Sequence, residues 1–169
     1  MTKTIRVQMS PSSVDKAIKE LKQYQSRIKV KQELFLTLLA SIGVKEAEIH
    51  FNPAVAQLMG TRASLDIDVV TTDKGFNIVA SGAQVAFLEF GAGVSSGTGY
   101  KGIKPPEIGP IGTHGKGKGS RDSWTFWASE EKTHWLRTSG NAPAMGMYYA
   151  SKRMQDNIRK IAREVFSSD

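Results

Sequence analysis

A stretch rich in glycine and lysine, "GTHGKGKGS" at residues 112–120, has the residue types that bind phosphate. Glycines allow backbone amides to converge on an anion, and lysine meets its charge. The phosphate-loop pattern G-x-x-x-x-G-K-[ST] fits Gly112, Gly117 and Lys118, but Gly119 stands where a hydroxyl must hold magnesium. The flanking sequence predicts neither a buried strand before this stretch nor a helix after it. We therefore do not predict a nucleotide site here.

The same stretch belongs to a basic loop that spans residues 91–121 and contains a single acidic residue, Glu107. The cations of this loop are Lys101, Lys104, Lys116, Lys118 and Arg121. Such a loop can contact the phosphate backbone of DNA without reading its sequence. It can equally face solvent or a protein partner. The sequence leaves these alternatives open.

Other residues that can do chemistry are scattered along the chain. His50, His114 and His134 fall in three separate segments, and the chain has no cysteine, so a metal site is not predicted. Asp66 and Asp68 share one face of a predicted strand. They could form a carboxylate pair, but a solvated strand face is the favoured interpretation. We expect no catalytic residue, no metal site and no cofactor.

Glu89 lies inside the apolar run "AQVAFLEFG" at residues 83–91. A buried ionised carboxylate costs several kcal/mol unless it is paired or hydrogen-bonded. We expect its compensation to come from backbone amides of the glycine turn at residues 91–93, or from a basic residue of a neighbouring subunit. Glu89 is interpreted as structural rather than catalytic.

Length and composition predict one globular domain that spans residues 1–169. The chain is 40% hydrophobic and 23% charged, which is typical of a protein that buries a core. Its formal net charge of +7 favours anionic partners without identifying one. The longest apolar run, at residues 34–44, is interrupted and too short to span a bilayer, so we expect no membrane partner.

The amino-terminal third is predicted to be mainly helical. Residues 5–9 alternate apolar and polar side chains and predict a short edge strand. Residues 10–43 predict a long helix, with Gly43 placed to end it. Residues 44–60 stay open between helix and strand, with Pro53 expected to end that element. The apolar stripe of the long helix is Val14, Ala17, Leu21, Tyr24, Ile28, Phe35, Leu38 and Ile42.

The rest of the chain predicts strands, a loop and a final helix. Residues 65–82 predict a hairpin, and residues 83–91 a buried central strand. Residues 91–121 predict a long mobile loop rich in glycine. Residues 124–136 predict a second hairpin, and residues 141–166 an amphipathic helix. The stripe of that last helix is Met147, Ala150, Met154, Ile158, Ile161 and Val165. The predicted fold is α+β, an antiparallel sheet packed by a long N-terminal helix and a C-terminal helix.

Two segments carry a resemblance to a known family. They are "SGAQVAFLEFGAGV" and, after the glycine-rich gap, "NAPAMGMYYASKRMQDNIRKIAREVF". In pattern and order, residues 12–166 resemble the tail-component family of long-tailed bacteriophages, also described as head-to-tail joining or tail completion proteins. That family has an A-x-x-x-E-F-G-[TA]-G-like motif and a later segment of proline and small residues. The residues assigned to these motifs are Ala86, Glu89, Phe90, Gly91 and Gly93, and then Pro143, Met145 and Ala150, with Ala86 one position closer to the glutamate than in the family pattern. The family often has an aromatic residue beside that proline, whereas this chain reads "APAMGMYY".

The resemblance implies a structural piece of the virion neck with no enzymatic activity and no cofactor. The implied partners are other copies of the chain in a ring, a hexamer when assembled, together with a head-completion or connector protein and a tail tube or tail terminator protein. The implied location is the virion neck, and the host cytoplasm during assembly. DNA in transit could touch the basic loop without being read. The alternative from charge alone is a sequence-independent nucleic-acid-binding module that uses the basic helix and loop.

Overall fold

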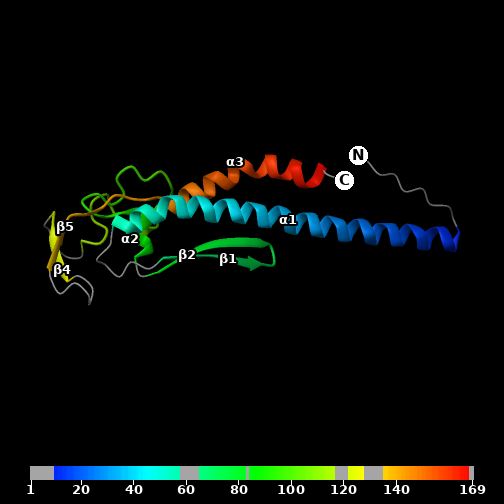
Figure 1. The fold of residues 1–169 in the computed structure, drawn as a ribbon, viewed down its shortest axis with the longest axis horizontal. Coiled ribbons are helices and arrows are strands. Elements are labelled where there is room, and N and C mark those ends of the chain that lie inside the picture. The colour runs from blue at the N-terminus through cyan, green and yellow to red at the C-terminus, as the bar shows by residue number, and fades with distance from the viewer. Residues whose placement is uncertain (1–9, 58–64, 83, 117–121, 128–134, 168–169) are drawn as a thin grey trace.

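The computed structural model describes residues 10–57, 65–82, 84–116, 122–127 and 135–167. The molecule is elongated along the long helix α1 (Pro11–Gln57), and the C-terminal helix α3 (Gly146–Ser167) runs antiparallel beside part of it (Figure 1). The hairpin of β1 (Asp66–Thr72) and β2 (Gly75–Ser81) also packs on α1. The predicted α+β class, with two long helices and antiparallel strands, is confirmed.

Gly43 does not end α1, which corrects the sequence-based prediction. The helix continues through Gly43, which is buried. A Cβ atom at this position would lie 2.7 Å from Met154 Sδ of α3 and would also overlap Ile78 Cδ1 of β2. The glycine therefore marks the place where α3 and the hairpin come closest to α1. Close packing, rather than a left-handed cap, explains this residue.

Pro53 does not end the helix either. The segment that the sequence left open is helical as far as Gln57, with Pro53 inside it, and residues 58–60 lie outside the described part. A proline within a helix removes one backbone hydrogen bond and costs about 3 kcal/mol. Phe51 is fully buried, and Ala54 and Val55 pack on the same core cluster. Apolar packing on both sides of Pro53 favours continuation of the helix.

The β1–β2 hairpin forms as predicted, in an antiparallel register from Asp66 opposite Ser81 to Thr72 opposite Gly75. The second hairpin is also confirmed, with β4 (Trp124–Trp127) paired to β5 (Trp135–Thr138). A third short ladder joins β3 (Ala92–Gly93) to β6 (Gly140–Asn141). In the described part of the chain the strands thus form three two-stranded sheets rather than one sheet. The strand predicted at residues 5–9 lies outside the described residues.

The predicted central strand at residues 83–91 is wrong, because this segment contains the short helix α2 (Val85–Phe90). A short apolar run has no period that separates a strand from a buried helical turn. The helical turn buries Leu88 and Glu89 and leaves Ala86 exposed. The Ala144 N–H donates to the Leu88 carbonyl at 2.7 Å. The segment after β6 thus provides a hydrogen-bond donor for a backbone carbonyl of α2, and no strand ladder is needed for it.

Two clusters of buried side chains fix these elements to one another. Ala47, Phe51, Leu88 and Ala150 join α1, α2 and α3. Leu39, Ile161 and Val165 join α1 to the C-terminal half of α3. The predicted C-terminal helix and most of its stripe are therefore confirmed, although Ile158 is exposed. Its predicted start at residue 141 is wrong, because Asn141 lies in β6 and α3 begins at Gly146.

The loop that begins at residue 91 folds back on α2 as far as the structure describes it, which is residue 116. The Gly97 N–H donates to the Phe90 carbonyl at 2.7 Å, and the Gly93 N–H donates to the His114 carbonyl at 2.8 Å. A 3₁₀ turn, η1 (Pro106–Ile108), places Ile108 in a buried position. The mobility expected of this loop stays a prediction.

Candidate functional site

Glu89 is the centre of the junction between α2, the glycine-rich loop and α3. It is only 4% exposed. The Met147 N–H donates to Glu89 Oε2 at 2.9 Å. The Tyr148 N–H at 3.1 Å and the Tyr100 hydroxyl at 3.0 Å both donate to Oε1. The predicted burial and compensation of this acid are confirmed, but the amides come from the start of α3 and not from the turn at residues 91–93.

The first turn of α3 needs this carboxylate because the helix has no cap of its own. Helix N-termini leave backbone N–H groups unpaired, and a capping side chain or a negative charge normally satisfies them. The residue before α3 is Met145, in a left-handed conformation with φ 58°, and the first turn contains no acidic residue. Glu89 therefore caps α3 from a distant part of the sequence.

The arrangement around Glu89 is that of a structural acceptor. Three donors occupy its two oxygens, which together can accept about four hydrogen bonds. The favourable end of the α3 dipole and the hydrogen bonds together offset the cost of burying the charge. One carboxylate thus connects α2, the glycine-rich loop and the start of α3.

Tyr100 links the loop to this junction. Its ring packs at 5.0 Å from the ring of Phe90, and its hydroxyl donates to Glu89. Burial raises the pKa of Tyr100 above its ordinary value, and the negative charge of Glu89 and the hydrogen bond to it raise that pKa further. The tyrosine thus stays a donor to the carboxylate across the ordinary pH range.

Tyr100→Phe is expected to lower the free energy of unfolding by about 1 to 2 kcal/mol near neutral pH, because the hydrogen bond to the carboxylate is lost. A raised folded-state pKa stabilises the native protein below the unfolded-state pKa of about 10, and this contribution declines as the pH rises above it. The advantage of the wild type over Tyr100→Phe should therefore shrink in urea titrations above about pH 10. Thr98→Ala, at an exposed side chain of the same loop, serves as the control. Parallel pH profiles for wild type and Tyr100→Phe would contradict the expectation.

An open cleft of about 770 Å³ lies beside the junction, between β2, α2, the loop and α3. Its walls include Val85, Phe90, Ile103 and Met147, and Ile103 is 96% exposed. Glu89 and Tyr100 also contribute to the lining, but they are already bonded to each other. The cleft is wide, and its lining is mainly apolar with a few polar side chains.

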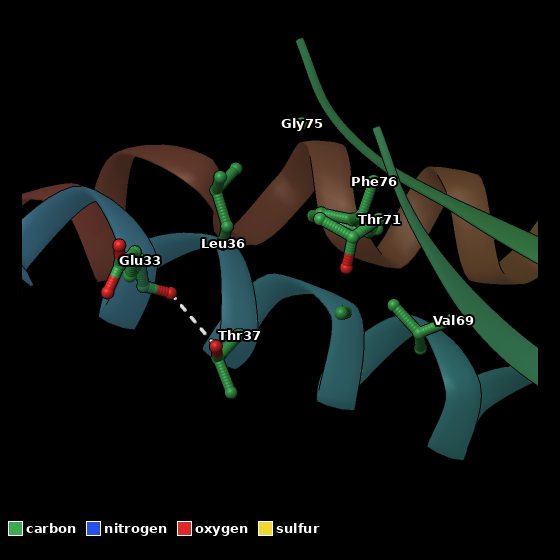
Figure 2. Close-up of a pocket in the computed structure, with 8 residues that line it drawn as sticks. Glu33, Leu36, Thr37, Val69, Thr71, Gly75 and Phe76 are labelled. Carbon is green, nitrogen blue, oxygen red and sulfur yellow. Dashed lines mark hydrogen bonds between the residues drawn. The ribbon is translucent and has the colours of Figure 1, made fainter. Parts of the chain in front are cut away.

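A second hollow, of about 200 Å³, lies between the middle of α1 and the β1–β2 hairpin (Figure 2). Within it the Thr37 hydroxyl donates to the Glu33 backbone carbonyl at 2.9 Å, so this polar side chain serves its own helix. The residues that line it are Glu33, Leu36, Thr37, Ala40, Val69, Thr71, Gly75 and Phe76. They bring no pair of titratable side chains together, and we assign no chemistry to this hollow.

The residues of the family-like motif gather around the junction. Gly91 and Gly93 have left-handed φ values of 76° and 63°. A Cβ atom on Gly91 would lie 2.9 Å from the Pro143 ring, so the two motif segments are in direct contact. Ala150 is buried in the core, and Ala86 lines the cleft. Tertiary structure thus joins residues that are about fifty positions apart in the sequence.

The basic side chains of the loop have separate partners in the described region. Lys116 Nζ lies 3.2 Å from Asp122 Oδ1 in an ion pair. Lys101 Nζ donates to the Tyr149 hydroxyl at 3.4 Å, and Lys104 is half-buried against Gly97. The remaining two predicted contacts, Lys118 and Arg121, lie outside the described residues.

Two of the histidines have structural roles. His50 stacks on Tyr149 with ring centroids 4.1 Å apart, and His114 Nδ1 lies 2.8 Å from the Gly91 carbonyl. The third, His134, lies outside the described residues. Across the ranges that the structure describes, no group of three or more His, Cys, Asp or Glu side chains is placed to hold a metal ion.

The other sequence candidates also lack a site-like setting. Asp66 and Asp68 are exposed on β1, as expected of a solvated strand face. In the stretch that resembles a phosphate loop, the Gly112 N–H already donates to the Ser96 carbonyl at 3.0 Å. Within the described part of the chain, no helix has the length and apolar character needed to cross a membrane.

Tyr100 and the first amides of α3 were not predicted from the sequence as partners of Glu89. One signal was present, because the last helix begins after "APAM" with no Ser, Thr, Asp or Asn in the cap position. A helix start without a capping side chain needs a hydrogen-bond acceptor, and a buried carboxylate needs hydrogen-bond donors. Each of these two groups can therefore satisfy the other. Comparison of the chain with protein-family models, with curated proteins and with solved structures finds no match in any of the three.

Proposed function

We propose that this protein is a structural component of a bacteriophage neck that joins the head and portal complex to the tail. The observation that carries the proposal is the junction around Glu89. The two motif segments that resemble the tail-component family contact each other there, and the carboxylate of one caps the helix that follows the other. On this proposal the motif residues hold α2, the loop and α3 together, as expected of a structural protein.

The exposed surface beside the junction supports the same proposal. Ile103 and Ile111 project from the loop, while the loop backbone is bonded to α2 and β3. Apolar side chains held out on a fixed framework are typical of protein contact surfaces. We propose that they contact other copies of the chain in a ring, a hexamer when assembled. A head-completion or connector protein and a tail tube or tail terminator protein are the proposed neighbours, in the virion neck and in the host cytoplasm during assembly.

Disruption of the gene in the phage or prophage genome that encodes this chain is expected to yield DNA-filled heads and separate tails. Electron microscopy of the lysate and plaque counts measure the result, and a plasmid copy should restore infectious particles. Intact, infectious virions from the disrupted genome would overturn the proposal.

The exposed loop surface has its own test in the same complementation. Ile103→Asp combined with Ile111→Asp should leave the fold intact, because both side chains are exposed, and should fail to restore plaques. Thr98→Asp, an exposed polar site of the same loop, is the matched control and should complement. Equal complementation by the two variants would show that the loop surface is not the contact.

The alternative, a sequence-independent nucleic-acid-binding module, predicts a different result for the isolated protein. Such a module binds duplex DNA tightly at moderate salt and loses affinity steeply as salt rises. We expect no such binding, since Lys116 is engaged by Asp122 and Lys101 by Tyr149. A steep salt dependence of tight binding would favour the alternative.

A further inference from the structure

The amino-terminal part of α1 extends past the end of α3 (Figure 1). We call residues 11–31 the α1 arm. Its large apolar side chains are between 37% and 55% exposed along one stripe, at Val14, Ile18, Leu21, Tyr24 and Ile28. An amphipathic helix normally buries such a stripe, because isolated helices of this length are only marginally stable in water.

The stripe of the arm continues an interface that is already present in the molecule. Val14, Leu21 and Ile28 are spaced by seven residues, and the same spacing leads to Phe35 and Ile42. Phe35 and Ile42 pack on the cluster that α3 shares with α1. The Phe35 ring lies 5.9 Å from the ring of Phe166, close to the end of α3 at Ser167. Beyond that point the heptad pattern persists while the covering helix stops.

We propose that the α1 arm is a self-association surface, which pairs antiparallel with the α1 arm of a second copy of this chain. In the heptad set by Val14, Leu21 and Ile28, four lysines of the arm occupy positions away from the apolar seam. They are Lys16, Lys19, Lys22 and Lys29, whereas Lys31, at the end of the arm, occupies a seam position. Pairing through the apolar stripe therefore buries hydrophobic surface and leaves these four charges in water.

The charges that flank the seam favour a second copy over an unrelated helix. Glu20 and Arg27 occupy the same flanking position of successive heptads. In an antiparallel pair with Leu21 opposite the partner's Tyr24, Glu20 lies near the partner's Arg27. The two-fold symmetry repeats this contact on the other side of the pair. One sequence thus supplies both halves of a charge-complementary interface.

The position of the packed body favours the antiparallel direction. The α1 arm is about 30 Å long by the rise of an α-helix, and all the other described elements lie at or beyond one end of it. Antiparallel arms overlap over their full length with the two bodies at opposite ends. Parallel arms would place two bodies side by side. This two-fold contact goes beyond the proposed function, because a closed ring requires a separate head-to-tail contact.

Sedimentation of the full-length protein tests the pairing. The wild type is expected to associate to a dimer, and Leu21→Glu with Tyr24→Glu should weaken association by at least about 100-fold, because four carboxylates enter the seam. Lys19→Glu, on the outer face, is the control and should still dimerise. The substituted side chains are exposed on a single chain, so neither variant should disturb the fold of that chain. At concentrations where all the proteins are monomeric, both variants should have the melting temperature of the wild type. A wild type that stays monomeric at concentrations of about 100 µM would overturn the proposal.

Charge reversal and cross-linking test the register and direction. Glu20→Arg and Arg27→Glu should each weaken the dimer, and the double variant should restore it. The chain contains no cysteine, so single thiols can be introduced cleanly. A mixture of Leu21→Cys and Tyr24→Cys chains should give mixed products with a short thiol cross-linker. Val14→Cys alone should not self-link, because the two copies of position 14 lie about 25 Å apart along the helix axis in this antiparallel register. Efficient self-linking of Val14→Cys would indicate parallel arms and refute the proposal. All these tests use the isolated protein. A negative result would therefore refute the pairing of the arms without affecting the proposed neck function, which the phage complementation tests separately.

Discussion

Glu89→Ala is expected to lower the free energy of unfolding by about 3 to 5 kcal/mol, the largest effect that we predict for a single side chain. The substitution leaves the Met147 and Tyr148 amides and the Tyr100 hydroxyl without their acceptor. A helix start that loses its cap costs about 1 kcal/mol, and each buried donor left unpaired adds about 1 to 3 kcal/mol. All three donors lie at one junction, so the single substitution should cause these losses of stability at once.

Urea unfolding of the full-length protein measures this effect. Glu89→Gln keeps the shape but loses the charge and one acceptor, so its loss should lie between those of wild type and Glu89→Ala. Glu164→Ala is the control, since Glu164 is an exposed carboxylate of α3, the helix that Glu89 caps, with a 4.0 Å contact to Lys160. Its effect should be below about 0.5 kcal/mol. A loss for Glu89→Ala no greater than that of the control would show that the junction does not depend on the carboxylate.

Gly93→Ala is expected to destabilise the protein by about 3 kcal/mol, from strain and overlap together. Gly93 has φ 63°, and a Cβ atom there would overlap the Ser139 carbonyl oxygen and lie 2.7 Å from the Trp124 ring. The first of these neighbours is backbone and cannot rotate away. The β3–β6 ladder, in which Gly93 pairs with Gly140, would have to open.

Gly99→Ala separates the two causes. Gly99 has a similar φ of 71°, but a Cβ atom there would meet no atom within 4 Å. It should therefore show the left-handed strain alone, about 1 kcal/mol. Denaturant titration of both variants measures the difference. If both lose the same stability, close packing is not the reason that the motif has glycine at position 93.

The sequence by itself determined the elements with a clear period. Leu65 and Ile67 alternate with polar neighbours and lie in or next to β1, and the apolar steps from Met147 to Val165 lie on α3. The predicted long helix is present in α1, because a helical repeat of that length is a strong signal. Five members of its stripe are nevertheless exposed: Val14, Leu21, Tyr24, Ile28 and Leu38. The burial of Glu89 also followed from its neighbours in the chain.

Only the tertiary structure decided where those elements end and what their polar groups bind. Gly43 and Pro53 are normally read as helix ends, but packing against Met154 on one side and around Phe51 on the other keeps α1 continuous. Residues 85–90 are helical because distant backbone groups satisfy their carbonyls, and the acid among them meets the amides of a helix far along the chain. Periodicity is a local property, so the sequence reveals it directly. Hydrogen-bond partners and close approaches are long-range, and they exist only once the chain has folded.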